Sequence, residues 1–165
     1  MREIKLSKGY IAVVDEDDYE WLIKHKWCSS SGHKTVYAVR GEATGVKYKR
    51  KIVMMHRQIL GTAPFAGAQV DHINGNGLDN RRTNLRWVTH KQNRRNEPKR
   101  RIKCTSSYKG VALVSGCKNP KWRAQIKVDG VQKFLGHFNE EIEAARAYNA
   151  AAMEYYGEFA NLNSL

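Results

Sequence analysis

The sequence lacks the features of membrane-spanning, secreted and disulfide-rich proteins. No apolar run is long enough to cross a bilayer, and the N-terminus MREIKLSKGY has no signal-peptide pattern. The three cysteines, Cys28, Cys104 and Cys117, are odd in number and form no C-x-x-C pair, so neither a disulfide framework nor a structural zinc knuckle is indicated. We therefore expect a soluble, cytoplasmic protein that is not secreted and has no membrane partner.

Acidic residues are also scarce, and their shortage is local. The chain has 29 Lys and Arg against 16 Asp and Glu, with a formal charge of +13 and a pI near 9.8. Residues 47–103 alone hold 15 basic and 3 acidic residues, whereas the segments on either side are almost neutral. Such a one-signed block favours a nucleic acid partner, with a solubilising face or an anionic membrane surface as alternatives. No amphipathic helix accompanies the charge, which argues against the membrane.

A chain of 165 residues is long enough for one or two small domains. In residues 1–46 the apolar run at 9–14 predicts a strand, and Asp15 is placed to cap a short helix whose acidic first turn suits the helix dipole. We expect Trp21, Leu22 and Trp27 in its core. Nothing in this segment indicates chemistry, so we interpret it as scaffold.

The following segment alternates strands and turns before a short helix. Residues 29–34 are typical of a turn, residues 35–40 of a half-buried strand, and residues 46–53 of a strand with Lys47, Lys49 and Lys51 on one face. A short helix is expected from Met54 to Leu60, ended by Gly61. His56 on this helix is either a partly buried structural histidine, which we favour, or a catalytic one.

Residues 70–96, VDHINGNGLDNRRTNLRWVTHKQNRRN, combine the polar residues that suggest a reactive site. Residues 70–73 predict a strand end and residues 74–77 a loop whose Asn and Gly residues tolerate positive φ. A return strand is expected at 85–88, and the capping-box pattern Thr89 to Gln92 should start a helix that carries His90, Asn93 and Asn96. The predicted unit is strand, loop, strand and helix.

The order Asp71-His72, Asn84 twelve residues later and Asn93 nine residues further resembles the HNH nuclease motif in its H-N-N form, with the ββα-metal fold of phage and intron-encoded homing endonucleases. The resemblance implies that His72 is the general base, that Asp71 and Asn93 are metal ligands, and that Asn84, grouped with His72 as catalytic, clamps the loop. His90 lies one helical turn before Asn93 and is kept as an alternative ligand or a phosphate contact.

The chemistry agrees with this resemblance. Phosphodiester hydrolysis needs a base for water, and a histidine can serve near neutral pH. It also needs a hard cation, which a carboxylate and an amide oxygen can hold. We expect Mg²⁺, with Mn²⁺ as a substitute and no small-molecule cofactor; the all-oxygen ligand set argues against zinc.

A basic linker at residues 97–106 follows the motif. Pro98 should end the helix at about Glu97, after which an extended arm is expected to bind phosphates, or else to be only a solvated linker. The basic residues predicted to contact DNA in the motif and the arm are Arg81, Arg82, Arg94, Arg95, Lys99, Arg100, Arg101 and Lys103.

Beyond residue 107 the pattern changes to three strands and one long helix. The strands are expected at 108–114, 121–128 and 131–138, with Asp129-Gly130 as a two-residue hairpin turn. Asn139 should cap a long helix that ends at Gly157, with an alanine-rich stripe packed on the sheet.

The sequences YKGV, KWRAQIK, FLGHF, EEIEAARAYNAAA and ANLN resemble an AP2 (ERF-type) DNA-binding domain over residues 107–163. The resemblance implies a sheet in the major groove that is backed by the helix. The predicted DNA contacts are Lys109, Arg123, Gln125, Lys127, Gln132 and Phe134. The first strand carries Ala112, Leu113 and Val114 where plant relatives have arginines and tryptophan, so the plant target is not implied. A protein-binding module is the alternative.

The sequence thus predicts an α+β protein: an N-terminal HNH (ββα-metal) nuclease domain at residues 1–96, a basic linker at 97–106, and an AP2-like three-stranded antiparallel sheet packed on one helix at 107–165. The predicted function is site-specific, metal-dependent cleavage of double-stranded DNA, of the homing type, in a bacterial or phage-infected cell. A monomer would nick one strand and a homodimer could cut both. The alternatives are a DNA-binding regulator with a degenerate motif and, more distantly, an RNA-processing enzyme.

Overall fold

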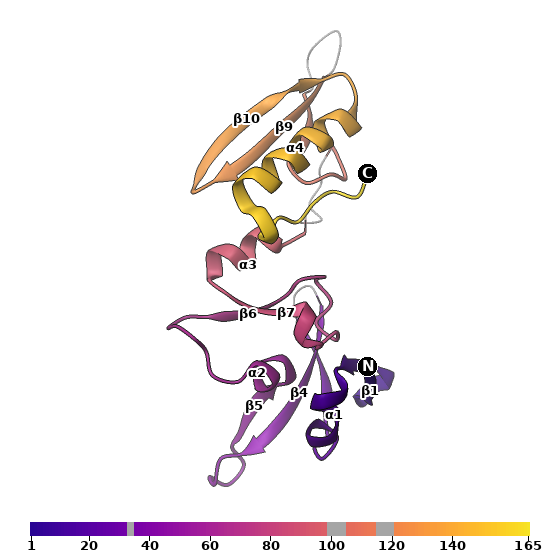
Figure 1. Cartoon of the computed structure of the whole chain (residues 1–165), viewed down its shortest axis with the longest axis vertical. Helices are drawn as coiled ribbons and strands as arrows, with labels where there is room; N and C mark the ends of the chain where they lie inside the picture. Colours follow the sequence, from indigo (N-terminus) through magenta and orange to yellow (C-terminus); the bar gives the residue numbers. More distant parts are fainter. Residues whose placement is uncertain (33–34, 99–104, 115–120) are drawn as a thin grey trace. The chain divides into compact units, whose positions relative to one another are not determined.

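The computed structural model describes residues 1–32, 35–98, 105–114 and 121–165 (Figure 1). Its fold is mixed, with several small sheets and few helices. The chain forms two compact units, Met1–Asn93 and Arg94–Leu165. Each unit has its own sheets and hydrophobic core. Among the described residues, no helix has the length and apolar character needed to cross a membrane.

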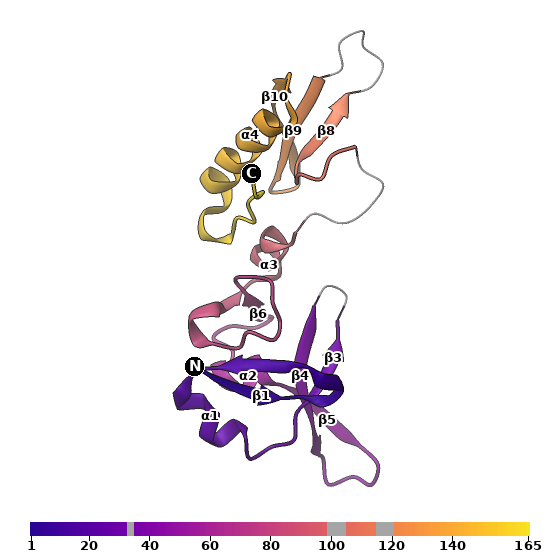
Figure 2. The same cartoon turned by 90° about the vertical axis from the view of Figure 1, so that its right-hand side faces the viewer.

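The described residues of the first unit form small antiparallel sheets and short helices. Strands β1 (Arg2–Lys5) and β2 (Ile11–Val14) form one sheet; β3 (Cys28–Ser31), β4 (Val36–Ala43) and β5 (Arg50–Met54) form the second; β6 (Gln69–His72) and β7 (Leu85–Val88) form the third. The helices are α1 (Glu16–Leu22) and α2 (Met55–Leu60), and α3 (His90–Asn96) begins in this unit and continues past its last residue, Asn93. Short 3-10 turns η1 (Ser7–Gly9) and η2 (Arg82–Asn84) precede β2 and β7. Figure 2 shows the β4–β5 hairpin extending away from α2 and β6.

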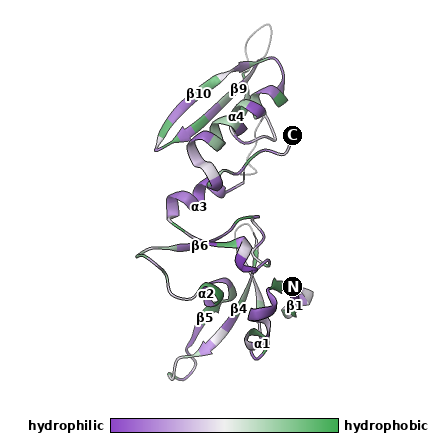
Figure 3. Cartoon of the chain, in the orientation of Figure 1, coloured by the Kyte–Doolittle hydropathy of each residue, from purple (hydrophilic) through white to green (hydrophobic). Residues whose placement is uncertain are grey.

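One core holds these elements together. Apolar side chains from both N-terminal strands, α1, β4, α2 and β7 meet in it, and Leu22, Val14 and Met55 are fully buried. Burial of each such side chain contributes about 1.5 to 3 kcal/mol relative to exposure. Trp27 is buried as predicted and its indole N–H donates to the carbonyl of Leu22 at 2.9 Å, whereas Trp21 is only half-buried. Helix α2 carries both hydrophobic and hydrophilic residues (Figure 3), and its Met55 and Ile59 side chains lie in the core.

Two local predictions for this unit are wrong, and one strand was not predicted. The predicted turn at 29–34 begins instead as strand β3, whose Ser29 backbone N–H donates to the Ser7 hydroxyl at 3.0 Å; residues 33–34 lie outside the described residues. Lys47 and Lys49 lie in the turn before β5, so they do not share a strand face with Lys51. Strand β1 was not predicted, because it is defined by its pairing with β2.

The Asp15 side chain does not cap α1. It accepts a hydrogen bond from the backbone N–H of Arg82 at 2.7 Å, while α1 begins without a side-chain cap. A distant donor has therefore replaced the local one. The consequence is a direct tie between the N-terminal scaffold and the segment that leads into β7.

The second unit is a three-stranded antiparallel sheet covered by one helix. Strands β8 (Val111–Val114), β9 (Lys121–Val128) and β10 (Val131–Phe138) are ordered β10-β9-β8, and α4 (Glu141–Tyr156) packs on them before the short turn η3 (Gly157–Phe159). Asp129 and Gly130 both have positive φ, 51° and 89°, as the predicted hairpin turn requires.

Its core is formed by β9 and the alanine stripe of α4. Ala124 packs with Ala144 and Ala145, and Ile126 packs with Tyr148 and two further alanines of the helix, as the alternation predicted. The predicted Asn139 cap is wrong, since the helix begins one residue later with Glu140 at the N-cap position and without a side-chain cap. The carboxamide of Asn163 binds both backbone groups of Lys109, at 2.6 and 3.1 Å, and therefore fixes the C-terminal tail beside β8.

Candidate active site

Strands β6 and β7 bring the predicted reactive residues together on a short hairpin. Asp71 lies opposite Arg86 and His72 opposite Leu85 in the ladder. Because side chains alternate along a strand, Gln69 and Asp71 share one face of β6, whereas Val70 and His72 share the other. Val70 and Leu85 join the core, so the His72 face points inward and the Asp71 face points away from the core.

Asn84 holds the loop between these strands. Its carboxamide oxygen accepts the Asn74 backbone N–H at 3.0 Å, and its Nδ2 donates to the Asn74 side chain at 3.0 Å and to the Asp79 carbonyl at 2.8 Å. Asn84 is itself buried. These contacts fix both ends of the loop, which is the geometry that a loop clamp requires, and they leave the chemistry to other residues.

Asp71 is held in an ion pair with Arg86. The Nε and Nη2 atoms of Arg86 donate to Oδ2 of Asp71 at 3.0 and 2.9 Å, and both side chains are largely buried, with 13% and 7% exposed. Such a pair is strongly destabilised if one partner alone is removed. Arg86 was not singled out from the sequence, although its place opposite Asp71 follows from the strand register.

Helix α3 brings Asn93 and His90 into contact with Gln69, which lies on the same face of β6 as Asp71. The predicted capping box is present: Gln92 N–H donates to the Thr89 hydroxyl at 3.2 Å, and Thr89 N–H donates to the Gln92 side chain at 2.8 Å. Asn93 Nδ2 donates to Gln69 Oε1 at 2.8 Å, and Gln69 Nε2 contacts His90 Nδ1 at 3.3 Å. Both predicted ligands therefore share Gln69, a residue that sequence reasoning missed.

His72 belongs to a buried aromatic cluster. The His56 ring meets it edge-on with centroids 5.0 Å apart, and the Tyr37 ring lies 5.8 Å from it. Burial lowers the pKa of His72, while the Asn80 side chain and the charges of Asp71 and Asp79 act in the opposite direction. The net effect favours a neutral imidazole at physiological pH, which is the form that can accept a proton.

His56 is fully inside this cluster. Burial, together with His72 and Arg57, lowers the pKa of His56 to about 3, and its Nδ1 atom is buried without a hydrogen-bond partner in the described part of the chain. The favoured prediction of a structural histidine agrees with this burial. Its contact with His72 was not predictable, because α2 and β6 meet only in the folded unit.

The two motif arginines predicted to bind DNA are engaged within the protein. Arg81 forms a two-point contact with Asp79, at 2.7 and 2.6 Å, and Arg82 forms one with the buried Asp18, at 2.8 Å for both contacts. Asp18 raises the pKa of Arg82, and Arg81 lowers the pKa of Asp79. The side chains remain 40% and 53% exposed, so each also presents surface to solvent.

The predicted residues around the linker divide into three groups. Arg94 is exposed, whereas Arg95 pairs with Asp129 at 3.2 Å and lies 4.9 Å from the Tyr156 ring. Lys99, Arg100, Arg101 and Lys103 lie outside the described residues. Helix α3 ends at Asn96, close to the end predicted from Pro98.

The second unit presents one polar sheet face. Gln132 lies opposite Lys127, Phe134 opposite Gln125, and His137 opposite Arg123, so these side chains share the face that α4 does not cover. Arg123, Lys127, Gln132 and Phe134 are exposed and Gln125 is half-buried. Lys109 is not on this face, because its ammonium donates to the carbonyls of Arg95 and Glu97 at 2.9 and 2.6 Å.

Comparison with known proteins identifies the family. The model of the HNH endonuclease family matches residues 50–95. An uncharacterized HNH endonuclease of Acanthamoeba polyphaga mimivirus is 30% identical over 165 residues, which cover 96% of this chain and 78% of the viral protein.

The chain belongs to the HNH endonuclease family. No solved structure matches it significantly. The family match spans β5 to α3, and therefore contains Asp71, His72, Asn84 and Asn93 together with the buried His56. HNH nucleases generally use divalent metal ions, which makes the donor set of this segment the relevant one.

The two residue types predicted as ligands suit a hard divalent cation. Asp71 has a carboxylate, and because the Asn93 nitrogen donates to Gln69, the carboxamide oxygen of Asn93 is the atom that could coordinate an ion. No cluster of three or more His, Cys, Asp or Glu side chains occurs among the described residues, so a site rich in sulfur or imidazole is not offered there. A cation at Asp71 would compete with the Arg86 guanidinium.

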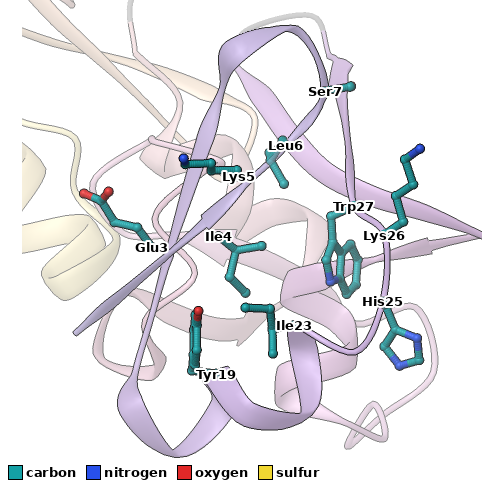
Figure 4. A pocket seen from close by; sticks show the side chains of 10 residues that line it. All are labelled: Glu3, Ile4, Lys5, Leu6, Ser7, Tyr19, Ile23, His25, Lys26 and Trp27. Atoms are coloured by element: carbon teal, nitrogen blue, oxygen red, sulfur yellow. The ribbon is translucent and has the colours of Figure 1, made fainter.

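A separate hollow of about 480 Å³ lies in the first unit (Figure 4). Ile4, Tyr19, Ile23 and Trp27 form its apolar part, and Lys26 lies at its edge. It contains none of the motif residues. It therefore does not enter the chemistry of the candidate site.

Proposed function

We propose that this chain is a site-specific, metal-dependent DNA endonuclease of the homing type that hydrolyses phosphodiester bonds in double-stranded DNA. The observation that carries the proposal is the β6–β7–α3 unit, where Asp71 and the α3 contacts of Gln69 lie on one face and a neutral His72 lies on the other. Membership in the HNH family supports nuclease chemistry at this unit.

In the proposed mechanism His72 accepts the proton of the attacking water. Its imidazole is kept neutral by burial and is oriented by the rings of His56 and Tyr37. Asp71 and Asn93 would hold Mg²⁺, or Mn²⁺ in its place, with His90 as the alternative to Asn93. A cation held by these residues would supply Lewis-acid stabilisation of the phosphate and of the leaving group. Products should carry a 5′ phosphate.

We further propose that the second unit selects the target. Its antiparallel sheet packed on one helix supports the AP2-like assignment, and the face with Arg123, Gln125 and Lys127 offers donors for bases and phosphates. With one candidate site per chain, a monomer would nick and a homodimer would cut both strands. The proposed place of action is the cytoplasm of a bacterial or phage-infected cell.

The second candidate is a DNA-binding regulator with an inactive motif. The Asp71–Arg86 ion pair favours it, because the carboxylate that should hold the cation is already neutralised. Titration of Mg²⁺ and Mn²⁺ into the protein with supercoiled plasmid separates the two functions. Nicked or linear DNA is expected for the nuclease, and tight, salt-sensitive binding without cleavage at any metal concentration would assign the regulator.

The role of His72 is tested in the same assay. His72→Ala should lower the cleavage rate by about 10²- to 10⁴-fold, the range for loss of a general base, and leave DNA binding nearly unchanged. His72→Gln provides a second variant that keeps a polar side chain, and His25→Ala is the control because His25 is exposed elsewhere in the first unit. Wild-type cleavage by both His72 variants would refute the assignment.

A further inference from the structure

The tip of the β4–β5 hairpin concentrates positive charge around one aromatic residue. We define the hairpin tip as residues 46–52, which contain four basic side chains around Tyr48: Lys47, Lys49, Arg50 and Lys51. Every residue of the tip is exposed. The sequence motif and the family chemistry assign no role to it.

Tyr48 is the unusual residue of the hairpin tip. Its side chain is 93% exposed and its φ is 65°, in the left-handed region that favours glycine or asparagine. Neither apolar burial nor backbone preference explains a tyrosine there. Val46 and Ile52 add exposed apolar surface on either side, at 57% and 62%. A large side chain in an unfavourable conformation and without a folded-state contact to the core indicates a function in binding.

The charge of the hairpin tip is not neutralised within the described part of the chain. No described carboxylate forms an ion pair with its four basic residues. Glu42 lies opposite Lys51 in the ladder, but its carboxylate pairs with Arg40 at 3.0 Å. Lys47 Nζ lies 5.1 Å from the Tyr48 ring centroid, so the exposed ring has a positive charge beside it. The natural complement of this tip is a polyanion.

The hairpin tip is connected to the candidate active site by ordered structure. The Thr44 hydroxyl donates to the Lys49 carbonyl at 3.0 Å, and the Lys49 N–H donates to the Val46 carbonyl at 3.0 Å, which braces the turn. From there the ladder runs from Ala43↔Arg50 to Val39↔Met54, and α2 follows directly with His56 against His72. The position of the tip is therefore fixed relative to His72.

We propose that the hairpin tip binds the sugar-phosphate backbone of double-stranded DNA beside the cleavage position, with its basic side chains on phosphates and Tyr48 against the groove wall. The inference rests on the proposed function for its ligand. Four residue steps separate the Val39 and Ala43 pairs, so the tip lies beyond about 13 Å of strand from the pair that leads into α2.

The charge contribution is tested by DNA binding in EDTA, where no cleavage occurs. The probe is a random-sequence duplex of roughly 40 base pairs, and the dissociation constant is measured by fluorescence anisotropy over a salt series. The triple variant Lys47→Gln, Lys49→Gln, Lys51→Gln should bind about 10- to 100-fold more weakly near 0.1 M salt, and its log–log salt slope should be shallower by about 2 to 3.

A matched triple variant controls for total charge. Lys5→Gln, Lys24→Gln, Lys26→Gln removes three exposed charges from another part of the first unit and should keep a slope close to that of the wild type. An equal loss in both triple variants would show that only net charge matters and would overturn the proposal for the hairpin tip.

Tyr48→Gly separates binding from stability. Glycine relieves the unfavourable φ, so the melting temperature should stay the same or rise by a few degrees, while duplex binding should weaken about 3- to 10-fold. Wild-type binding by this variant and by the hairpin triple variant would refute the proposal and leave the nuclease assignment intact. A wild-type protein that binds no duplex even at low salt would refute the DNA substrate and the hairpin contact together.

Discussion

We predict that mild acid lowers the free energy of unfolding of the first unit, because of the buried pair His56 and His72. The His56 side chain is 4% exposed, lies edge-on to His72, and has its pKa lowered to about 3, first by burial and then by the charges of His72 and Arg57. In the unfolded chain a histidine titrates near 6.5. Between about pH 3 and 6.5, His56 is therefore mostly protonated in the unfolded state and mostly neutral in the folded state.

The sign and size of the effect follow from this difference. A lowered folded pKa contributes stability above pH 6.5, and that stability is lost as the pH falls toward 3. Each pH unit in the window costs up to about 1.4 kcal/mol, so acidification from about pH 6.5 to 4.5 should lower the free energy of unfolding by about 2 kcal/mol through His56 alone. The pKa of His72 is lowered as well, which adds loss in the same direction.

Urea unfolding followed by tryptophan fluorescence measures this slope. In a Trp122→Phe background the remaining tryptophans, Trp21, Trp27 and Trp87, all belong to the first unit. His56→Leu keeps an apolar side chain in the cluster and should flatten the dependence by about 1.4 kcal/mol per pH unit.

The exposed His25 provides the control for this experiment. His25→Leu should keep the wild-type dependence, because this side chain is solvent-accessible. A wild-type free energy of unfolding that stays constant between about pH 6.5 and 4.5, or a His56→Leu variant with the wild-type slope, would contradict the buried neutral state.

Two further predictions concern the ion pair and the second unit. Arg86→Gln should lower the free energy of unfolding of the metal-free protein by about 3 kcal/mol, because the buried Asp71 carboxylate loses its paired guanidinium. The same variant should tighten Mn²⁺ binding about 10-fold in electron paramagnetic resonance titrations, and unchanged Mn²⁺ affinity would contradict the competition between cation and guanidinium. Gly110→Ala should destabilise the second unit by more than about 3 kcal/mol in calorimetry, because φ is +77° and the added Cβ would lie 2.0 Å from the Tyr148 ring. A variant that melts at the wild-type temperature would show that the backbone at this position can shift away from the helix.

The elements predicted best are those that local signals define. The capping box of Thr89 and Gln92 marks the start of α3, Gly61 ends α2, and the Asp129-Gly130 pair sets the β9–β10 turn. Each of these depends on residues within a few positions of one another. The alternation in β9 likewise identified its buried face, because a sheet covered by one helix must divide its side chains between core and solvent.

The failures arise where a distant group changed a local outcome. Asp15 was expected to cap α1 but binds the backbone of Arg82, and Lys109 was expected on the sheet face but donates to carbonyls at the end of α3. No sequence motif marked Gln69 or Arg86. Their importance follows from strand register and from the approach of α3, which the sequence pattern of residues 70–96 does not encode.

Contacts from residues 1–46 support their interpretation as scaffold, because they hold the loop of the motif in place. The family match covers residues 50–95, yet the loop inside it is bound from outside: Val13 exchanges backbone hydrogen bonds with Leu78 and Asn80, both at 2.8 Å, and the Thr35 hydroxyl accepts the Gly77 N–H at 2.9 Å.

The Asp18–Arg82 pair adds a nearly buried carboxylate to the same set of ties. Since Asn80 in turn faces His72 and shifts its pKa, strand β2 acts on the proposed base through one intermediate residue. The segment with the proposed catalytic residues therefore depends on the N-terminal strands for its loop geometry, even though those strands supply none of these residues.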